Sequence, residues 1–78
     1  MPATVKAVAA AFVERAEALG LKGVKRDTAA LDFFCGAATL AELSGNAEAS
    51  RALSLAASLL VSVRGYMAVK QLAAGVAP

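Results

Sequence analysis

Apolar side chains recur at steps of three and four residues along most of this chain, which is the spacing of one face of an α-helix. The first such stripe comprises Val5, Val8, Phe12, Val13, Ala16 and Leu19, and charged residues lie on the opposite side. Thr4 is suited to cap the start of this helix, and Gly20 is suited to end it in a left-handed conformation. The stripe therefore predicts an amphipathic helix over residues 4–19.

A second helical stretch has apolar residues around most of its circumference. These residues are Leu31, Phe33, Phe34, Ala37, Ala38, Leu40 and Leu43. Asp27 and Thr28 are two candidate N-caps, so the helix is expected over residues 28–44. Gly36 lies in the middle of this helix, where glycine costs about 1 kcal/mol relative to alanine. We therefore expect Gly36 to permit the close approach of another backbone.

The longest stretch runs from Asn46 to Ala74, and Arg64 is the only charged residue between Arg51 and Lys70. Two adjacent lines of mostly apolar residues follow it: Leu53, Ala56, Leu60, Val63 and Met67 in one, and Ala52, Leu55, Leu59, Ser62, Tyr66 and Val69 in the other. The remaining side carries small residues rather than charged ones. Such a helix must be covered on most of its circumference. The pattern predicts a central helix over residues 47–73, capped by Asn46.

This third helix is long for so small a protein. A continuous helix over residues 47–74 measures about 42 Å at 1.5 Å per residue, whereas a compact domain of this size is roughly 30 Å across. Either the helix breaks near Arg64 and Gly65, or its last turns extend beyond the rest of the protomer. Because the apolar periodicity continues from Tyr66 to Ala74, we expect a continuous helix, with Gly65 as the position of any bend.

The predicted fold is all-α: a single helical domain over residues 1–78, built as a small three-helix bundle with a long C-terminal helix. The short connection through Gly45 makes the second and third helices antiparallel neighbours or sets them at a sharp corner. Phe33 and Phe34 are then expected to pack on the third helix. A chain of 78 residues buries only about 60% of its unfolded surface, so it is marginally stable alone.

The composition offers little for catalysis or metal binding. There is no histidine and only one cysteine, Cys35, so the commonest general base and a zinc ligand set are both missing. The glycines form no phosphate-binding loop. We therefore expect a protein that is not an enzyme, with no cofactor, no metal and no small-molecule substrate. Cys35 is interpreted as a small residue at a helix interface, and a single cysteine favours a reducing compartment.

Lys22, Lys25 and Arg26 form the only basic cluster. The simpler interpretation is a solvated loop whose charge complements the C-terminal end of the first helix. The alternative is a contact for phosphate or for an acidic partner. A formal net charge of +2 does not by itself indicate nucleic-acid binding. The third helix also lacks the polar and basic first turns of a recognition helix, so DNA binding is disfavoured.

Membrane association is a more serious alternative. The segment from Ala52 to Val69 reaches the lower length limit for a spanning helix. Arg64 lies near its middle, where a cation costs about 2.5–3.5 kcal/mol on insertion. A spanning helix is therefore disfavoured, and the alternative function is a small membrane-associated protein with its C-terminal helix at the bilayer.

The predicted function is a non-catalytic interaction or assembly module, because the apolar surface of these helices exceeds what one small core encloses. It self-associates, with a dimer favoured, or binds a partner protein through the long C-terminal helix. The predicted interface comprises Leu60, Val63, Tyr66, Met67, Val69 and Leu72. Tyr66 and Met67 are the expected anchors, since aromatic residues and methionine are enriched in interface cores. The expected location is the cytoplasm, or the virion or host cytoplasm if the chain is phage-encoded, an origin inferred from size alone.

Overall fold

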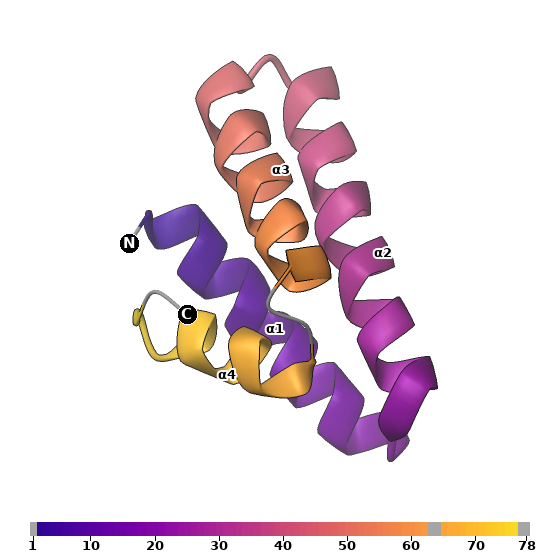
Figure 1. Cartoon of the computed structure of the whole chain (residues 1–78). Coiled ribbons are helices and arrows are strands. Elements are labelled where there is room, and N and C mark those ends of the chain that lie inside the picture. Colours follow the sequence, from indigo (N-terminus) through magenta and orange to yellow (C-terminus); the bar gives the residue numbers. More distant parts are fainter. Residues whose placement is uncertain (1, 63–64, 77–78) are drawn as a thin grey trace.

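The protein folds into four α-helices over the residues that the computed structural model describes, 2–62 and 65–76 (Figure 1). The helices are α1 (Ala3–Leu19), α2 (Gly23–Leu43), α3 (Ala47–Ser62) and α4 (Tyr66–Ala73). The prediction of an all-α fold is confirmed, because the described residues form helices, turns and short connections only. None of these helices has both the length and the hydropathy needed to cross a bilayer.

The prediction of one long C-terminal helix is wrong, because the chain breaks at Gly65. This residue has φ 106° and ψ 167°, a backbone conformation that is almost exclusive to glycine. The helices on either side, α3 and α4, are therefore separate, and the predicted span of 47–73 is divided between them. Val63 and Arg64, which also belong to the predicted long helix, lie outside the described residues.

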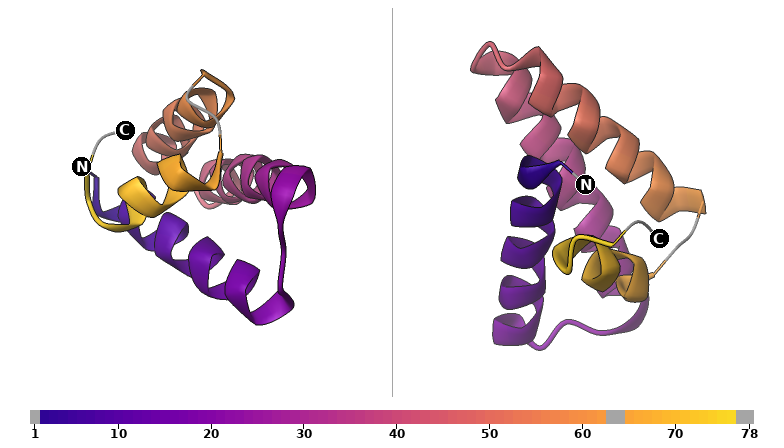
Figure 2. Two further views of the ribbon diagram at one scale, coloured as in Figure 1. Left: turned by 60° about the horizontal axis from the view of Figure 1, so that its bottom comes forward. Right: turned by 90° about the vertical axis from the view of Figure 1, so that its left-hand side faces the viewer.

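The physical reason for the break is burial. The Cα trace extends over 33 × 22 × 20 Å, so a straight helix of about 42 Å does not fit within it. After the break α4 turns back and packs against α1, at an angle to it (Figure 2). Val69 and Leu72 on α4 thereby become almost completely buried, with 0% and 1% of their surface exposed. This burial stabilises the turned-back conformation, since each such side chain contributes about 1.5–3 kcal/mol.

Both short connections stop the helices where the sequence predicts. The amide of Leu21 donates to the carbonyl of Ala16 at 3.0 Å, and the amide of Asn46 donates to that of Ala41 at 2.9 Å. These bonds close the C-terminal ends of α1 and α2 around Gly20 and Gly45. The side chain of Asn46 then accepts a hydrogen bond from the amide of Ala49 at 3.1 Å. The predicted cap of α3 by Asn46 is confirmed.

The starts of α1 and α2 differ from the prediction. Helix α1 begins at Ala3, so Thr4 lies inside it rather than at its cap. Helix α2 begins at Gly23, so Asp27 and Thr28 lie within the helix and make no cap. The extra turn of α2 places Arg26 over the ring of Tyr66, with the guanidinium carbon 4.1 Å from the ring centroid. This contact favours the longer helix without a side-chain cap.

The core lies where α1, α3 and α4 meet the inner side of α2. Its largest fully buried side chains are Phe12, Phe34, Leu53, Val69 and Leu72, and alanines fill much of the rest. Helices α2 and α3 run antiparallel, as one of the two predicted arrangements has it, and they pack along most of their length (Figure 1). Buried alanine explains this close packing, because it adds little bulk between the helices.

Phe33 packs against Phe12 of α1 with the two rings tilted, 5.5 Å between ring centroids, and its expected packing on α3 stays a prediction. The expectation for Gly36 is wrong. Gly36 is exposed, and a Cβ atom built on it meets no atom within 4 Å. No neighbouring backbone therefore requires a glycine at this position. Helix α1 packs on the side of α2 that carries Phe33. The apolar spacing along α2 shows that this side is covered, but it does not show whether α1 or α3 covers it.

Candidate interaction surfaces

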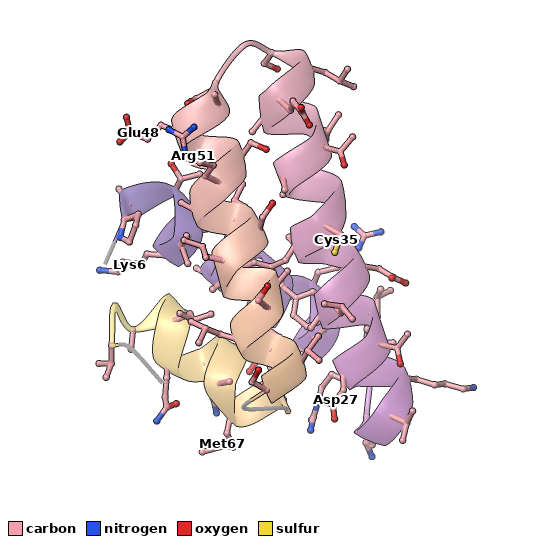
Figure 3. All side chains as sticks on the ribbon, turned by 45° about the horizontal axis from the view of Figure 1, so that its top comes forward. Lys6, Asp27, Cys35, Glu48, Arg51 and Met67 are labelled. Atoms are coloured by element: carbon pink, nitrogen blue, oxygen red, sulfur yellow. The ribbon has the colours of Figure 1, made fainter. Side chains whose placement is uncertain are left out.

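The predicted interface residues do not form one exposed surface. Leu60, Val69 and Leu72 are buried in the protomer's own core. Tyr66 is half-buried, and its hydroxyl donates to the carbonyl of Val13 at 3.5 Å. Only Met67 projects outward, with 69% of its surface exposed, and Figure 3 shows it on α4, far from the tip of the α2–α3 hairpin. Val63 lies outside the described residues.

Exposed apolar side chains gather instead on the side of α3 that faces away from the core. We call this surface the α3 outer face and define it as Ser54, Leu55, Ser58, Leu59 and Val61, all of which are exposed. Leu55, Leu59 and Val61 expose 68%, 39% and 63% of their surface. The helix has no charged residue from Ala52 to Ser62. Such an uncharged, partly apolar strip is unusual for a solvated helix face.

A shallow groove of about 520 Å³ runs along one edge of this face, between α2 and α3. One line of residues from each helix forms its walls: Leu31, Cys35, Ala38, Thr39 and Glu42 from α2, and Ser50, Ser54, Ala57, Ser58 and Val61 from α3. Most of these side chains are small, which keeps the groove open enough for a side chain of another helix. We call it the α2–α3 groove.

Two of the four hydroxyl groups that line the α2–α3 groove, those of Thr39 and Ser58, are bonded within their own helices. Thr39 donates to the carbonyl of Cys35 at 3.0 Å, and Ser58 donates to the carbonyl of Ser54 at 3.2 Å. A partner that covers the groove therefore need not replace a hydrogen bond for either donor. This lowers the cost of removing water from a surface that contains polar atoms.

A second groove follows the opposite edge of the α3 outer face and is almost entirely apolar. It has a volume of about 190 Å³ and is lined by Pro2, Val5, Ala52, Leu55, Ala56, Leu59 and Leu72. These residues come from the start of α1, from α3 and from α4. We call it the apolar groove. Leu55 and Ser58 also line a further hollow on α3, together with Ser50, Arg51 and Ser54.

The three cations of the predicted basic cluster are only partly brought together. Lys22 and Arg26 line a cavity of about 240 Å³ at the junction of α1 and α2, together with Ala16, Glu17, Gly20, Leu21 and Tyr66. Lys25 is exposed and does not line it. Arg26 lies over the Tyr66 ring as described above, and the Nζ atom of Lys70 lies 5.9 Å from the centroid of the same ring.

The part of the chain that the structure describes contains no cluster of side chains suited to a metal ion. In residues 2–62 and 65–76, no three histidine, cysteine, aspartate or glutamate side chains are placed to hold a metal ion. Cys35 is exposed in the wall of the α2–α3 groove (Figure 3) and is not buried between two helices of the protomer. The interpretation of Cys35 as a small residue at a helix interface therefore does not hold within the protomer.

Sequence reasoning missed the α3 outer face because it treated Leu55 and Leu59 as part of one wide buried arc. The signal is their position on the helix surface. On a helix Leu55 lies next to Ser54 and Ser58, which are polar, and on the side opposite Leu53 and Leu60. Comparison of the chain with protein-family models, with curated proteins and with solved structures finds no match. The functional proposals below therefore depend on the geometry of these surfaces.

Proposed function

We propose that this chain is a non-catalytic assembly module that self-associates through the α3 outer face. The observation that carries the proposal is the exposure of Leu55, Leu59 and Val61 on the uncharged outer side of α3, where Leu55 and Leu59 line the apolar groove and Val61 lines the α2–α3 groove. Apolar patches of this kind mark protein interfaces more often than solvated surface. The interface expected from the sequence thus moves from α4 to α3, while the expected class of function stays the same.

A second copy of the chain is the partner that this surface fits best. The α3 outer face carries both projecting apolar side chains and the grooves that can receive them. A two-fold interface requires this kind of self-complementarity, because the same patch must be used by both copies. Two copies of α3 would pack antiparallel, with Leu55 and Val61 of each copy directed toward the grooves of the other. Ser54 and Ser58 are small enough to let the two helices approach closely.

The dimer is expected to be reversible. Stable interfaces usually involve about 20–30 residues on each side, and the α3 outer face with its two grooves comprises 17 residues, which is below that range. Association should therefore depend on protein concentration. Light scattering and sedimentation without detergent, over a wide range of concentrations, will measure this dependence directly.

The decisive variant is Val61→Asp. It places a charge in the α2–α3 groove, where burial against a second copy would cost several kcal/mol, so we expect a monomer at every concentration. Val24→Asp is the matched control, because Val24 is exposed to 80% and lines neither groove. Circular dichroism should show unchanged helix content in both variants. Dissociation by Val24→Asp to the same degree would mean that added charge alone explains the effect.

Met67→Asp separates this surface from the one expected on α4. Met67 lines neither groove, so this variant should keep the wild-type oligomeric state. If Met67→Asp yields monomers and Val61→Asp does not, the interface lies on α4.

Membrane association is the competing outcome of the same experiments. A protein that stays monomeric in solution, and that floats with phosphatidylcholine vesicles unless Val61 is replaced by aspartate, would use this face to bind lipid. That pair of results would overturn the assembly proposal. The measurement is flotation of the wild-type protein, Val61→Asp and Val24→Asp at several salt concentrations.

A further inference from the structure

The cavity at the junction of α1 and α2 has the composition of a site for a phosphate group. Lys22 and Arg26 line it, and Glu17 is its only acidic lining residue. Lys22 is also the N-cap residue of α2, and no side chain bonds to the first turn of that helix. The positive end of the helix dipole therefore lies at the edge of the cavity, close to two cationic side chains.

The arrangement around Tyr66 holds Arg26 in place. The guanidinium carbon lies 4.1 Å from the centroid of the Tyr66 ring. The Tyr66 ring is in turn held by a T-shaped contact with the ring of Phe12, with 6.4 Å between the two centroids. A guanidinium group stacked on a ring keeps the N–H groups at its edge available for an oxygen ligand. Arginine in this state is well suited to bind phosphate through two parallel hydrogen bonds.

Two charged side chains beside this ring have an atom that is shielded from solvent and has no hydrogen-bond partner among the described residues: Arg26 at Nε and Asp27 at one carboxylate oxygen. The Nζ atom of Lys70 lies 5.9 Å from the Tyr66 centroid. An anion in the cavity would be attracted by Lys22 and Arg26 and opposed by the carboxylates of Glu17 and Asp27.

We infer that this cavity binds a phosphate group, with Arg26 as the main ligand and Lys22 as the second. This site is independent of the α3 outer face, because none of its lining residues lies on α3. The inference makes one of the two alternatives for the basic cluster specific: it selects Lys22 and Arg26 and excludes Lys25. The same chemistry is offered by inorganic phosphate and by the headgroup of an anionic lipid such as phosphatidic acid.

The chain contains a built-in probe for this site. Tyr66 is its only tyrosine and there is no tryptophan, so intrinsic emission reports on the ring that lies beneath Arg26. The experiment titrates inorganic phosphate at constant ionic strength, with chloride as the reference anion. We expect a saturable change in Tyr66 emission with phosphate and none with chloride. Amide chemical shifts of Gly20, Leu21 and Lys22 provide a second readout.

Arg26→Gln should weaken phosphate binding by about tenfold or more, because it removes a charged two-bond contact. Lys25→Gln removes the same charge from the neighbouring position outside the cavity, and should change binding by less than about twofold. Arg26→Lys keeps the charge but loses the planar fork, so its binding should fall between the two. Thermal unfolding of each variant shows whether the fold is retained.

Vesicles of phosphatidylcholine with and without phosphatidic acid identify the source of the phosphate. A response to inorganic phosphate supports a soluble phosphate ligand, and a response to phosphatidic acid alone supports a lipid headgroup. In each case the response must be lost in Arg26→Gln. Equal loss in Lys25→Gln and Arg26→Gln would reduce the site to general electrostatic attraction and overturn the inference. The absence of a saturable response to both probes would do the same.

Discussion

At the scale of single residues, two glycines show that the same amino acid can be required at one position and dispensable at another. Gly65 has a backbone conformation that is close to exclusive to glycine. Gly36 lies inside α2, and a Cβ atom added to either glycine meets nothing within 4 Å. Steric contact therefore does not distinguish the two positions. Only the backbone dihedral angles do.

The first prediction at this scale compares Gly65→Ala with Gly36→Ala. Gly65→Ala should lower the free energy of unfolding by about 1–3 kcal/mol, because alanine is strained at this φ and ψ. Gly36→Ala should raise it by about 0.5–1 kcal/mol, since alanine is the better helix former and space is available. Urea denaturation measures both. Equal effects of the two substitutions would show that Gly65 does not hold the observed conformation in solution.

Tyr66 illustrates how far residue-level prediction reaches. Its place on a helical line and its type suggested an interface anchor, whereas the structure has it half-buried in the protomer. Its contacts come from residues far away in the sequence: Phe12 and Val13 on α1, and Arg26 on α2. No local pattern connects these positions. The basic cluster was visible in the sequence, but its separation into two residues at the cavity and one in solvent was not.

At the scale of elements, helix ends were predictable where a local hydrogen-bonding motif determines them. The ends of α1 and α2 at Gly20 and Gly45 and the cap of α3 at Asn46 depend on neighbouring atoms only. The separation of α3 from α4 was not predictable in the same way. Apolar periodicity continues across Gly65 because both helices bury one face, and the pattern is the same for one helix or for two.

The position of α4 against α1 leads to a prediction at this scale. Leu72→Ala should lower the free energy of unfolding by about 2–5 kcal/mol, because it leaves a cavity in a closely packed core. Met67→Ala is the control on the same helix, where the exposed side chain should contribute less than about 0.5 kcal/mol. Thermal or urea denaturation checks the pair. Similar small effects at both positions would indicate that α4 does not pack in the core, as in a continuous C-terminal helix.

At the scale of the whole molecule, three surfaces with different chemistry have no residue in common. The α3 outer face is uncharged and flanked by two grooves, the cavity at the α1–α2 junction is cationic, and the outward side of α4 presents Met67. Self-association and phosphate binding can therefore be tested independently, because a substitution in one surface leaves the others intact.

Cys35 provides a prediction for the assembled state. It is exposed in the wall of the α2–α3 groove, so a second copy that packs on α3 should shield its thiol. The rate of reaction with a chromogenic disulfide reagent, measured per cysteine, should fall as the protein concentration rises into the dimer range. In Val61→Asp the rate should stay constant. A constant rate in the wild-type protein, together with a dimer mass from light scattering, would place the contact on another face.

The sequence by itself determined that this protein is helical and where α1 and α2 end. These properties depend on residue type and on hydrogen bonds between near neighbours. Only the tertiary structure decided that the chain turns back at Gly65, that Leu60, Val69 and Leu72 are buried, and that Leu55, Leu59 and Val61 are exposed. The physical reason is that a wide apolar arc can be covered in several ways, and the packing of helices distant in sequence selects one of them.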